Sequence, residues 1–214
     1  VSGAGSWSVC AETGTADSLP AEASAYTGNT EDGIFLQGSV IAESVTWENL
    51  GVPYVVSDTV DVGGTAGEPA VLTITEGVTV QFERDRGLRF SRTGAASALH
   101  VLGSAGSPVE LSARGAATAG FWRGIEVGRG ATEVLLSNVS VLGAGGSEAA
   151  IVVADVPVFV ENVIVERSAS TGIRLEGAAA FVKGSSGLVI RECEVPMLLP
   201  AAAVPTLPTS GLAF

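Results

Sequence analysis

Short apolar segments recur along this chain from about residue 33 onward. Within them, apolar residues alternate with other residues, as at 71–74, 78–82, 99–102 and 108–111. Alternation with a period of two is typical of a β-strand that buries one face. Gly, Ser, Asp and Pro separate the segments and supply turns. The pattern therefore predicts an all-β chain of many short strands.

Two kinds of segment repeat in a fixed order in the second half of the chain. The first is found at 124–127, 150–153 and 172–175, and the second follows each copy at 135–141, 159–165 and 189–195. A period of about 22–26 residues accommodates two or three strands with their corners, at about 3.3 Å per strand residue. Successive turns would then pair in parallel about 4.8 Å apart. The repeat predicts a right-handed parallel β-helix of about seven rungs.

Two other repetitive folds fit the sequence less well. An antiparallel sandwich would join its strands with Asn-Gly or Asp-Gly hairpins, and Asp32-Gly33 is the only such pair in the chain. A leucine-rich repeat would keep Leu and Asn at fixed positions that are absent here.

The ends of the chain differ from its middle. We expect residues 1–32 to form an N-terminal cap or partial rung, residues 33–196 the β-helix, and residues 197–214 a tail that resembles the start of a next module. Residues 206–214 of the tail resemble residues 18–26, and a cysteine lies upstream of each segment, Cys193 and Cys10, respectively. Because open solenoid ends expose unpaired strand edges, we expect self-association by end-to-end stacking or swapping.

Four segments carry a further signal: Val52–Val56, Leu72–Phe82, Ser107–Leu111 and Trp122–Ile125. The last three of them match the forms LTI-x-x-G-V-x-V-x-F, G-x-x-x-x-P-V-x-L (counted from Gly103) and W-x-G-I, respectively. In this order they resemble bacterial extracellular right-handed β-helix proteins of the pectin-lyase-like kind, over about residues 33–196. The resemblance implies the fold and a secreted or cell-envelope location. It implies no particular activity, because such domains mostly serve as surface scaffolds.

Composition narrows the range of partners. The 11 basic and 23 acidic residues give a formal charge of −12, and aromatic residues make up 6%. Such acidity argues against binding nucleic acid through its phosphates and against adsorption to an anionic membrane. No apolar run approaches the roughly 18 residues of a membrane span, so membrane insertion is not expected.

The densest run of charge is Glu83-Arg84-Asp85-Arg86, with Arg89 and Arg92 beyond it. Clustered carboxylates on a β-helix face can bind calcium or perform acid/base catalysis. Here arginines flank the acids, and no second acidic cluster follows one period later. A salt-bridged turn is the simpler interpretation. The alternative is a ligand site at Glu83, Arg84, Asp85, Arg86 and Arg89, at which the arginines contact an anionic sugar.

Three residues are expected to stack along the solenoid. Asn138 and Asn162 align at a strand corner, where asparagines of successive turns can satisfy one another. Asn138-Val139-Ser140 also matches a glycosylation acceptor, which would need an exposed loop. Cys193 aligns with Val139 and Val163, which predicts a small residue facing the core. A disulfide from Cys193 to Cys10 would have to span about seven turns.

The sequence presents no convincing catalytic residues and no metal or cofactor motif. His100 is the only histidine, which excludes a multi-histidine metal site, and it alternates outward between two apolar residues. Trp47 and Trp122 lie near the starts of rungs, where a buried corner is the commoner role. We therefore expect a noncatalytic extracellular or cell-surface module that binds a glycan or a surface protein. The alternative is a pectin-lyase-like polysaccharide lyase or glycoside hydrolase.

Overall fold

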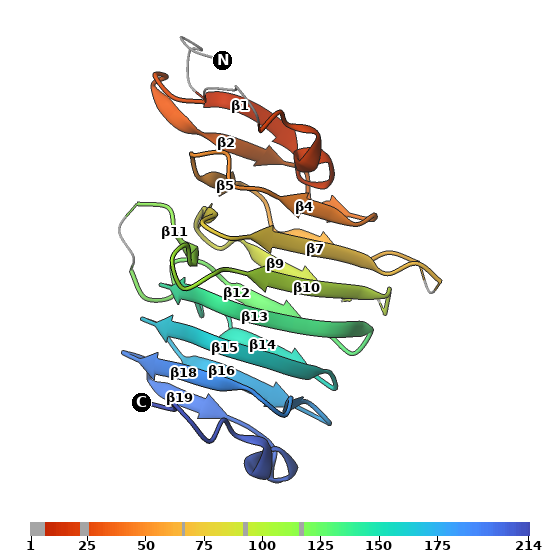
Figure 1. Cartoon of the computed structure of the whole chain (residues 1–214), viewed down its shortest axis with the longest axis vertical. Helices are drawn as coiled ribbons and strands as arrows, with labels where there is room; N and C mark the ends of the chain where they lie inside the picture. The colour runs from red at the N-terminus through yellow and green to blue at the C-terminus, as the bar shows by residue number, and fades with distance from the viewer. Residues whose placement is uncertain (1–6, 22–25, 66, 92–93, 116–117) are drawn as a thin grey trace.

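The chain winds into a right-handed parallel β-helix of about seven turns (Figure 1). Its computed structural model describes residues 7–21, 26–65, 67–91, 94–115 and 118–214. The turns stack along the long axis of the molecule, from β1 (Trp7–Glu12) at one end to β19 (Val195–Leu198) at the other. The prediction of a parallel β-helix is confirmed.

Two parallel sheets form the walls of the solenoid. In the described part of the chain, sheet B has seven strands: β3 (Val40–Ile41), β6 (Val60–Val62), β9 (Gly87–Phe90), β12 (Gly124–Val127), β14 (Ala149–Ala154), β16 (Thr171–Glu176) and β19. Sheet A contains β1, β2 (Glu31–Gln37), β4 (Val45–Trp47), β5 (Tyr54–Val56), β7 (Ala70–Thr75), β8 (Thr79–Phe82), β10 (Ser97–Leu102), β11 (Val109–Ala113), β13 (Ala131–Leu142), β15 (Pro157–Glu166), β17 (Ala180–Phe181) and β18 (Ser186–Arg191).

Sheet A covers two faces of the solenoid because its longest strands turn a corner. The first part of β13 pairs with β10, and the second part pairs with β11. Asn138 lies between these parts with φ +48°, a left-handed conformation that asparagine tolerates better than most residues. Asn162 makes the same bend in β15, with φ +52°.

The register of the turns follows the predicted repeat in most places. In sheet B, Ile125 pairs with Ile151 and Ile151 with Ile173, so the three copies of the first segment stack directly. In sheet A, Val139 pairs with Val163, as the first two copies of the second segment require. These pairings confirm that part of the repeat.

The predicted alignment of Cys193 with Val139 and Val163 is wrong, although Cys193 does pack against the core. Leu188, not Cys193, continues the stack of Val139 and Val163. The true corner of β18 is Gly187, whose φ of +66° reproduces the bend of the asparagines five residues before the position that the sequence match implied. Cys193 instead lies in the turn between β18 and β19, half-buried, and its thiol contacts the carbonyl of Arg191 at 3.3 Å.

The core is a set of stacked aliphatic side chains with a few large aromatic rings at corners. Trp47 and Trp122 are fully buried. The indole of Trp122 stacks on Phe82 with ring centroids 4.0 Å apart and donates a hydrogen bond to the carbonyl of Leu142. Burial of these rings supplies much of the apolar area of their turns.

The two ends of the solenoid are closed differently. At the N-terminal end, the 3₁₀ helix η1 (Thr13–Ser18) lies against β4 and accepts a hydrogen bond from the Trp47 indole. At the C-terminal end, η2 (Ala201–Thr206) lies against β17, and Ala213 pairs with Val189 of β18. Residues 1–6 and 22–25 of the expected cap, and Arg92, lie outside the described residues.

Two further observations bear on the expectations from sequence. No helix within the described ranges is both long enough and apolar enough to cross a membrane. Cys10 on β1 and Cys193 near β19 are both free thiols, and they lie at opposite ends of the stack (Figure 1).

Candidate functional site

The charged segment Glu83–Arg86 forms the turn between β8 and β9, and its side chains engage separate partners. Glu83 pairs with Arg114 at 2.5 Å, across one turn of the solenoid. The guanidinium of Arg84 lies over the ring of Phe121, 4.7 Å from its centroid. Asp85 adopts a φ of +60°, and its carbonyl accepts a hydrogen bond from Arg123.

Of the four charged side chains in this turn, only that of Glu83 forms a salt bridge among the described residues. Arg86 is exposed. Arg114 is shared further, because it also pairs with Glu31 at 3.3 Å and stacks on the ring of Trp7 at 4.6 Å. Glu83 and Arg84 thus contact residues outside the segment, and among the described residues Asp85 and Arg86 form no ion pair. Arg89 stands apart from them on β9.

Asn138 and Asn162 come together at the corner of sheet A. The amide of Asn162 donates a hydrogen bond to Oδ1 of Asn138 at 3.2 Å. The amide of Asn138 in turn donates to the carbonyl of Gly103 at 3.2 Å. These hydrogen bonds link three successive turns at the position where the backbone is bent. Both asparagine side chains are therefore engaged in hydrogen bonds within the solenoid.

His100 points outward from β10, and its Nε2 lies 2.8 Å from Oε2 of Glu133 on the next turn. No serine, cysteine or second carboxylate of the described residues shares this hydrogen bond. In the described residues, no three His, Cys, Asp or Glu side chains come together in a way that could hold a metal ion.

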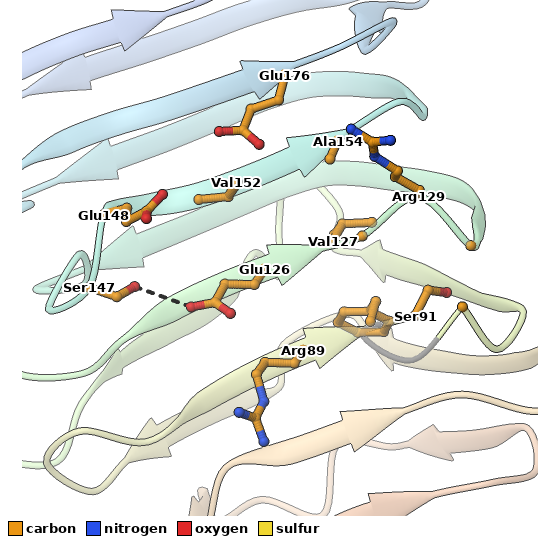
Figure 2. A pocket seen from close by; sticks show the side chains of 14 residues that line it. Arg89, Ser91, Glu126, Val127, Arg129, Ser147, Glu148, Val152, Ala154 and Glu176 are labelled. Atoms are coloured by element: carbon orange, nitrogen blue, oxygen red, sulfur yellow. Dashed lines mark hydrogen bonds between the residues drawn. The ribbon is translucent and has the colours of Figure 1, made fainter.

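A groove lies on the outer face of sheet B (Figure 2). Its volume is about 550 Å³, and it crosses β9, β12, β14 and β16. The side chains that define it are Arg89, Glu126, Arg129, Glu148, Val152 and Glu176. We call it the sheet B groove.

Arg89, Glu126 and Val152 form the floor of the groove and belong to a longer column of outward-facing residues in register. Asp61, Arg89, Glu126, Val152 and Arg174 occupy the same position on successive turns, from β6 to β16. Side chains alternate between the two faces of a strand, so the neighbours of these residues pack into the core. The column is therefore presented to solvent along the axis of the solenoid.

Two sets of turns form the walls of the groove. On one side lie the turns after β9 and β12, which contribute Ser91, Gly94 and Gly128–Gly130. On the other side lies the turn before β14, which contributes Ser147 and Glu148. Ala154 widens the apolar part of the floor beside Val152. The result is an open trough with polar walls and a small apolar centre.

Most charged groups at the groove are already paired with one another. Arg89 pairs with Asp61 at 2.7 Å and Arg129 with Asp155 at 2.8 Å. Arg174, at the edge of the groove, holds two carboxylates, Glu148 at 3.2 Å and Glu176 at 2.7 Å.

Glu126 is the exception among these charged groups. It accepts a hydrogen bond from the hydroxyl of Ser147 at 3.2 Å (Figure 2). Within the part of the chain that the structure describes, it forms no ion pair with an arginine, lysine or histidine. The carboxylate is half-exposed in the trough and is free to accept hydrogen bonds from a ligand.

The sequence-based prediction placed the ligand site at Glu83–Arg86 and Arg89, and the structure brings only Arg89 into the groove. Glu126 and Val152 were missed as site residues. A signal for them existed, because they occupy the third position of the repeated segments 124–127 and 150–153. Arg129 and Glu148 lie in turns, and no repeat placed them.

Comparisons of the chain with protein-family models, with curated proteins and with solved structures find no match.

Proposed function

We propose that this chain is a noncatalytic module of the extracellular β-helix kind that binds a glycan in the sheet B groove. The observation that carries the proposal is the trough itself, of about 550 Å³, open along the solenoid axis and lined by Glu, Arg and Ser side chains. Carboxylates, guanidinium groups and hydroxyls are suited to the hydroxyl groups of a sugar chain because they offer several acceptors and donors each. An elongated trough suits a polymer.

The resemblance of the sequence to bacterial pectin-lyase-like β-helix proteins supports a secreted or cell-envelope location, with a surface glycan as the partner within reach. A protein partner is the less favoured occupant. The face of a sheet offers side chains and no free strand edge, so a peptide could not add itself by main-chain hydrogen bonds.

A polysaccharide lyase or glycoside hydrolase is the second candidate, and one observation favours it. Glu126, Glu148 and Glu176 place carboxylates on three successive turns around Val152 (Figure 2). Acid/base cleavage needs two such groups aimed at one bond. Glu148 and Glu176 are instead both bound by Arg174, which leaves Glu126 without a second free carboxylate. This pairing is why we favour binding over cleavage.

The two candidates are separated by incubating the protein with acidic, neutral and amino polysaccharides, with and without calcium. Binding is measured by calorimetry, and cleavage by reducing ends and by the ultraviolet absorbance of unsaturated products. We expect binding without product. Glu126→Gln should weaken the binding of the amino polysaccharide, and Glu110→Gln, an isosteric change on the exposed face of β11, should not. Any time-dependent product that Glu126→Gln abolishes would establish the enzyme instead.

Self-association through one end is a separate part of the proposal. Four exposed apolar residues gather at the C-terminal end: Val195, Leu198, Val204 and Phe214, with 41, 49, 53 and 67% of their surface exposed. The N-terminal end instead exposes Glu12, Asp17 and Ser18, whose burial would be unfavourable. Two C-terminal ends therefore fit each other better than unlike ends do, in a symmetric contact between two copies.

Sedimentation velocity over a range of concentrations tests this contact. We expect a monomer–dimer equilibrium that Val204→Asp shifts to monomer. Leu102→Asp should leave it unchanged, because Leu102 is 41% exposed on the side of the solenoid at β10. A monomer at every concentration, or a dimer that Val204→Asp leaves intact, would refute it.

A further inference from the structure

The charges around the sheet B groove do not balance. Two arginines and three carboxylates line it: Arg89, Arg129, Glu126, Glu148 and Glu176. Their ion-pair partners outside the lining add one arginine, Arg174, and two carboxylates, Asp61 and Asp155. The described residues thus leave an excess of two negative charges at the groove. The whole chain adds to this field, with a formal charge of −12. A cation is therefore attracted to the trough and an anion is repelled from it.

The arginines do not offset this preference at the point of contact. The guanidinium groups of Arg89, Arg129 and Arg174 are each held by at least one carboxylate at 2.7–2.8 Å. Each of these contacts uses one or two of the five N–H donors of a guanidinium group, so the pairing offsets the positive charge without occupying every donor. The excess of negative charge at the groove is therefore our reason for proposing a cationic ligand in place of the anionic sugar expected from the sequence.

We propose that the sheet B groove selects glycans that carry free amino groups, with an ammonium group bound at Glu126. The inference rests on the proposed glycan-binding function and names its ligand class. Glu126 lies between the turns that carry Arg89 and Val152, and Ser147 orients its carboxylate from one wall. An ammonium group can donate three hydrogen bonds, and its positive charge would give the carboxylate of Glu126 an ion-pair partner.

The surroundings of Glu126 suit the rest of an amino sugar. On the next turn of the solenoid, about 4.8 Å further along the axis, Val152 offers a small apolar surface to the face of a sugar ring. Glu148 on the same turn and Glu176 on the following one have carboxylate lone pairs that Arg174 does not use, and these can accept hydrogen bonds from hydroxyls. The trough thus offers one site for charge and several for hydroxyl groups.

Calorimetry with three hexasaccharides of the same β-1,4 backbone tests the ligand class. The probes are the glucosamine hexamer, its fully N-acetylated counterpart and cellohexaose. We expect the glucosamine hexamer to bind about tenfold more tightly than the other two, and its affinity to fall as salt is added. Glu126→Gln should weaken its binding about fivefold and leave the binding of cellohexaose unchanged. Glu110→Gln, outside the groove, should change neither.

Each other outcome overturns a defined part of the reasoning. Equal binding of the three hexasaccharides would overturn the selection of amino groups and leave glycan binding intact. Binding of none of them, nor of any polysaccharide in the panel above, would refute the proposed function itself. Hexalysine binding as tightly as the glucosamine hexamer, and as sensitively to Glu126→Gln, would show that the groove takes a cationic peptide instead.

Discussion

Gly124→Ala tests how closely the turns of sheet B approach one another beside the groove. Gly124 opens β12, two residues before Glu126, with a φ of +108°. A methyl group added there would lie 2.4 Å from the carbonyl oxygen of Ala150 and 2.8 Å from that of Ala149. Both contacts are with backbone of the next turn, which cannot move aside as a flexible side chain would.

The expected loss of stability has two sources. Holding an alanine at this φ costs about 2 kcal/mol, because only glycine adopts that conformation freely. Relief of the overlap requires β12 and β14 to separate by about 1 Å, since ordinary contact begins at 3.4 Å. That separation should break one or two of the hydrogen bonds between the strands, worth about 1 kcal/mol each. Together these effects lower the free energy of unfolding by about 3–4 kcal/mol.

Urea unfolding followed by far-ultraviolet circular dichroism and by tryptophan fluorescence measures this loss, provided that the two transitions coincide. Gly106→Ala is the matched control, because nothing lies within 4 Å of its added methyl group and its φ is not positive. The control should lie within about 0.5 kcal/mol of the parent chain. A Gly124→Ala protein within about 1 kcal/mol of the parent would refute the close approach of β12 and β14.

Three further predictions concern residues away from the groove. Asn162→Asp keeps a residue that tolerates a positive φ but removes the amide that donates to Asn138, so urea unfolding should show a loss of about 1 kcal/mol. Burial raises the pKa of Tyr54, so the folded state favours the neutral phenol. The free energy of unfolding should therefore fall as the pH rises above about 10. Tyr54→Phe should remove this fall when urea unfolding is repeated at alkaline pH. Burial also raises the pKa of the Cys193 thiol, whereas Cys10 is exposed; in single-cysteine variants at pH 7.5, a thiol reagent should label Cys10 first, and equal rates would contradict the half-buried position of Cys193.

The fold was predictable because each turn of a β-helix buries side chains of similar size at the same positions in one narrow core. Residues such as Ile125, Ile151 and Ile173 face one narrow core, so the sequence repeats a branched aliphatic side chain at each of them. Alternation within a strand fixes which face is buried, and the repeat fixes which strands stack. Both signals are local, and both survive the variable lengths of the turns between them.

The error at Cys193 shows where those signals fail. A bend with positive φ can be made by asparagine or by glycine, and the last turn uses Gly187 where earlier turns use Asn138 and Asn162. Matching apolar residues without the corner moved the third copy by five positions, from Leu188 to Cys193. The physical constraint was the backbone conformation at the corner, and the side chain that satisfies it had changed.

The groove could be predicted only in part, for a reason that concerns charge more than fold. In the densest charged segment, Glu83–Arg86, Glu83 forms an ion pair with Arg114 and Arg84 lies over the ring of Phe121. Glu126 is isolated in the sequence and is the carboxylate left without an ion pair among the groove residues described. Ligand preference depends on which charge remains after internal pairing, and partners such as Arg89 and Asp61 are 28 residues apart in the sequence although they lie on neighbouring turns. The proposed site of this β-helix was therefore located by the outward-facing residues that stack from turn to turn, and not by the local density of charge in the sequence.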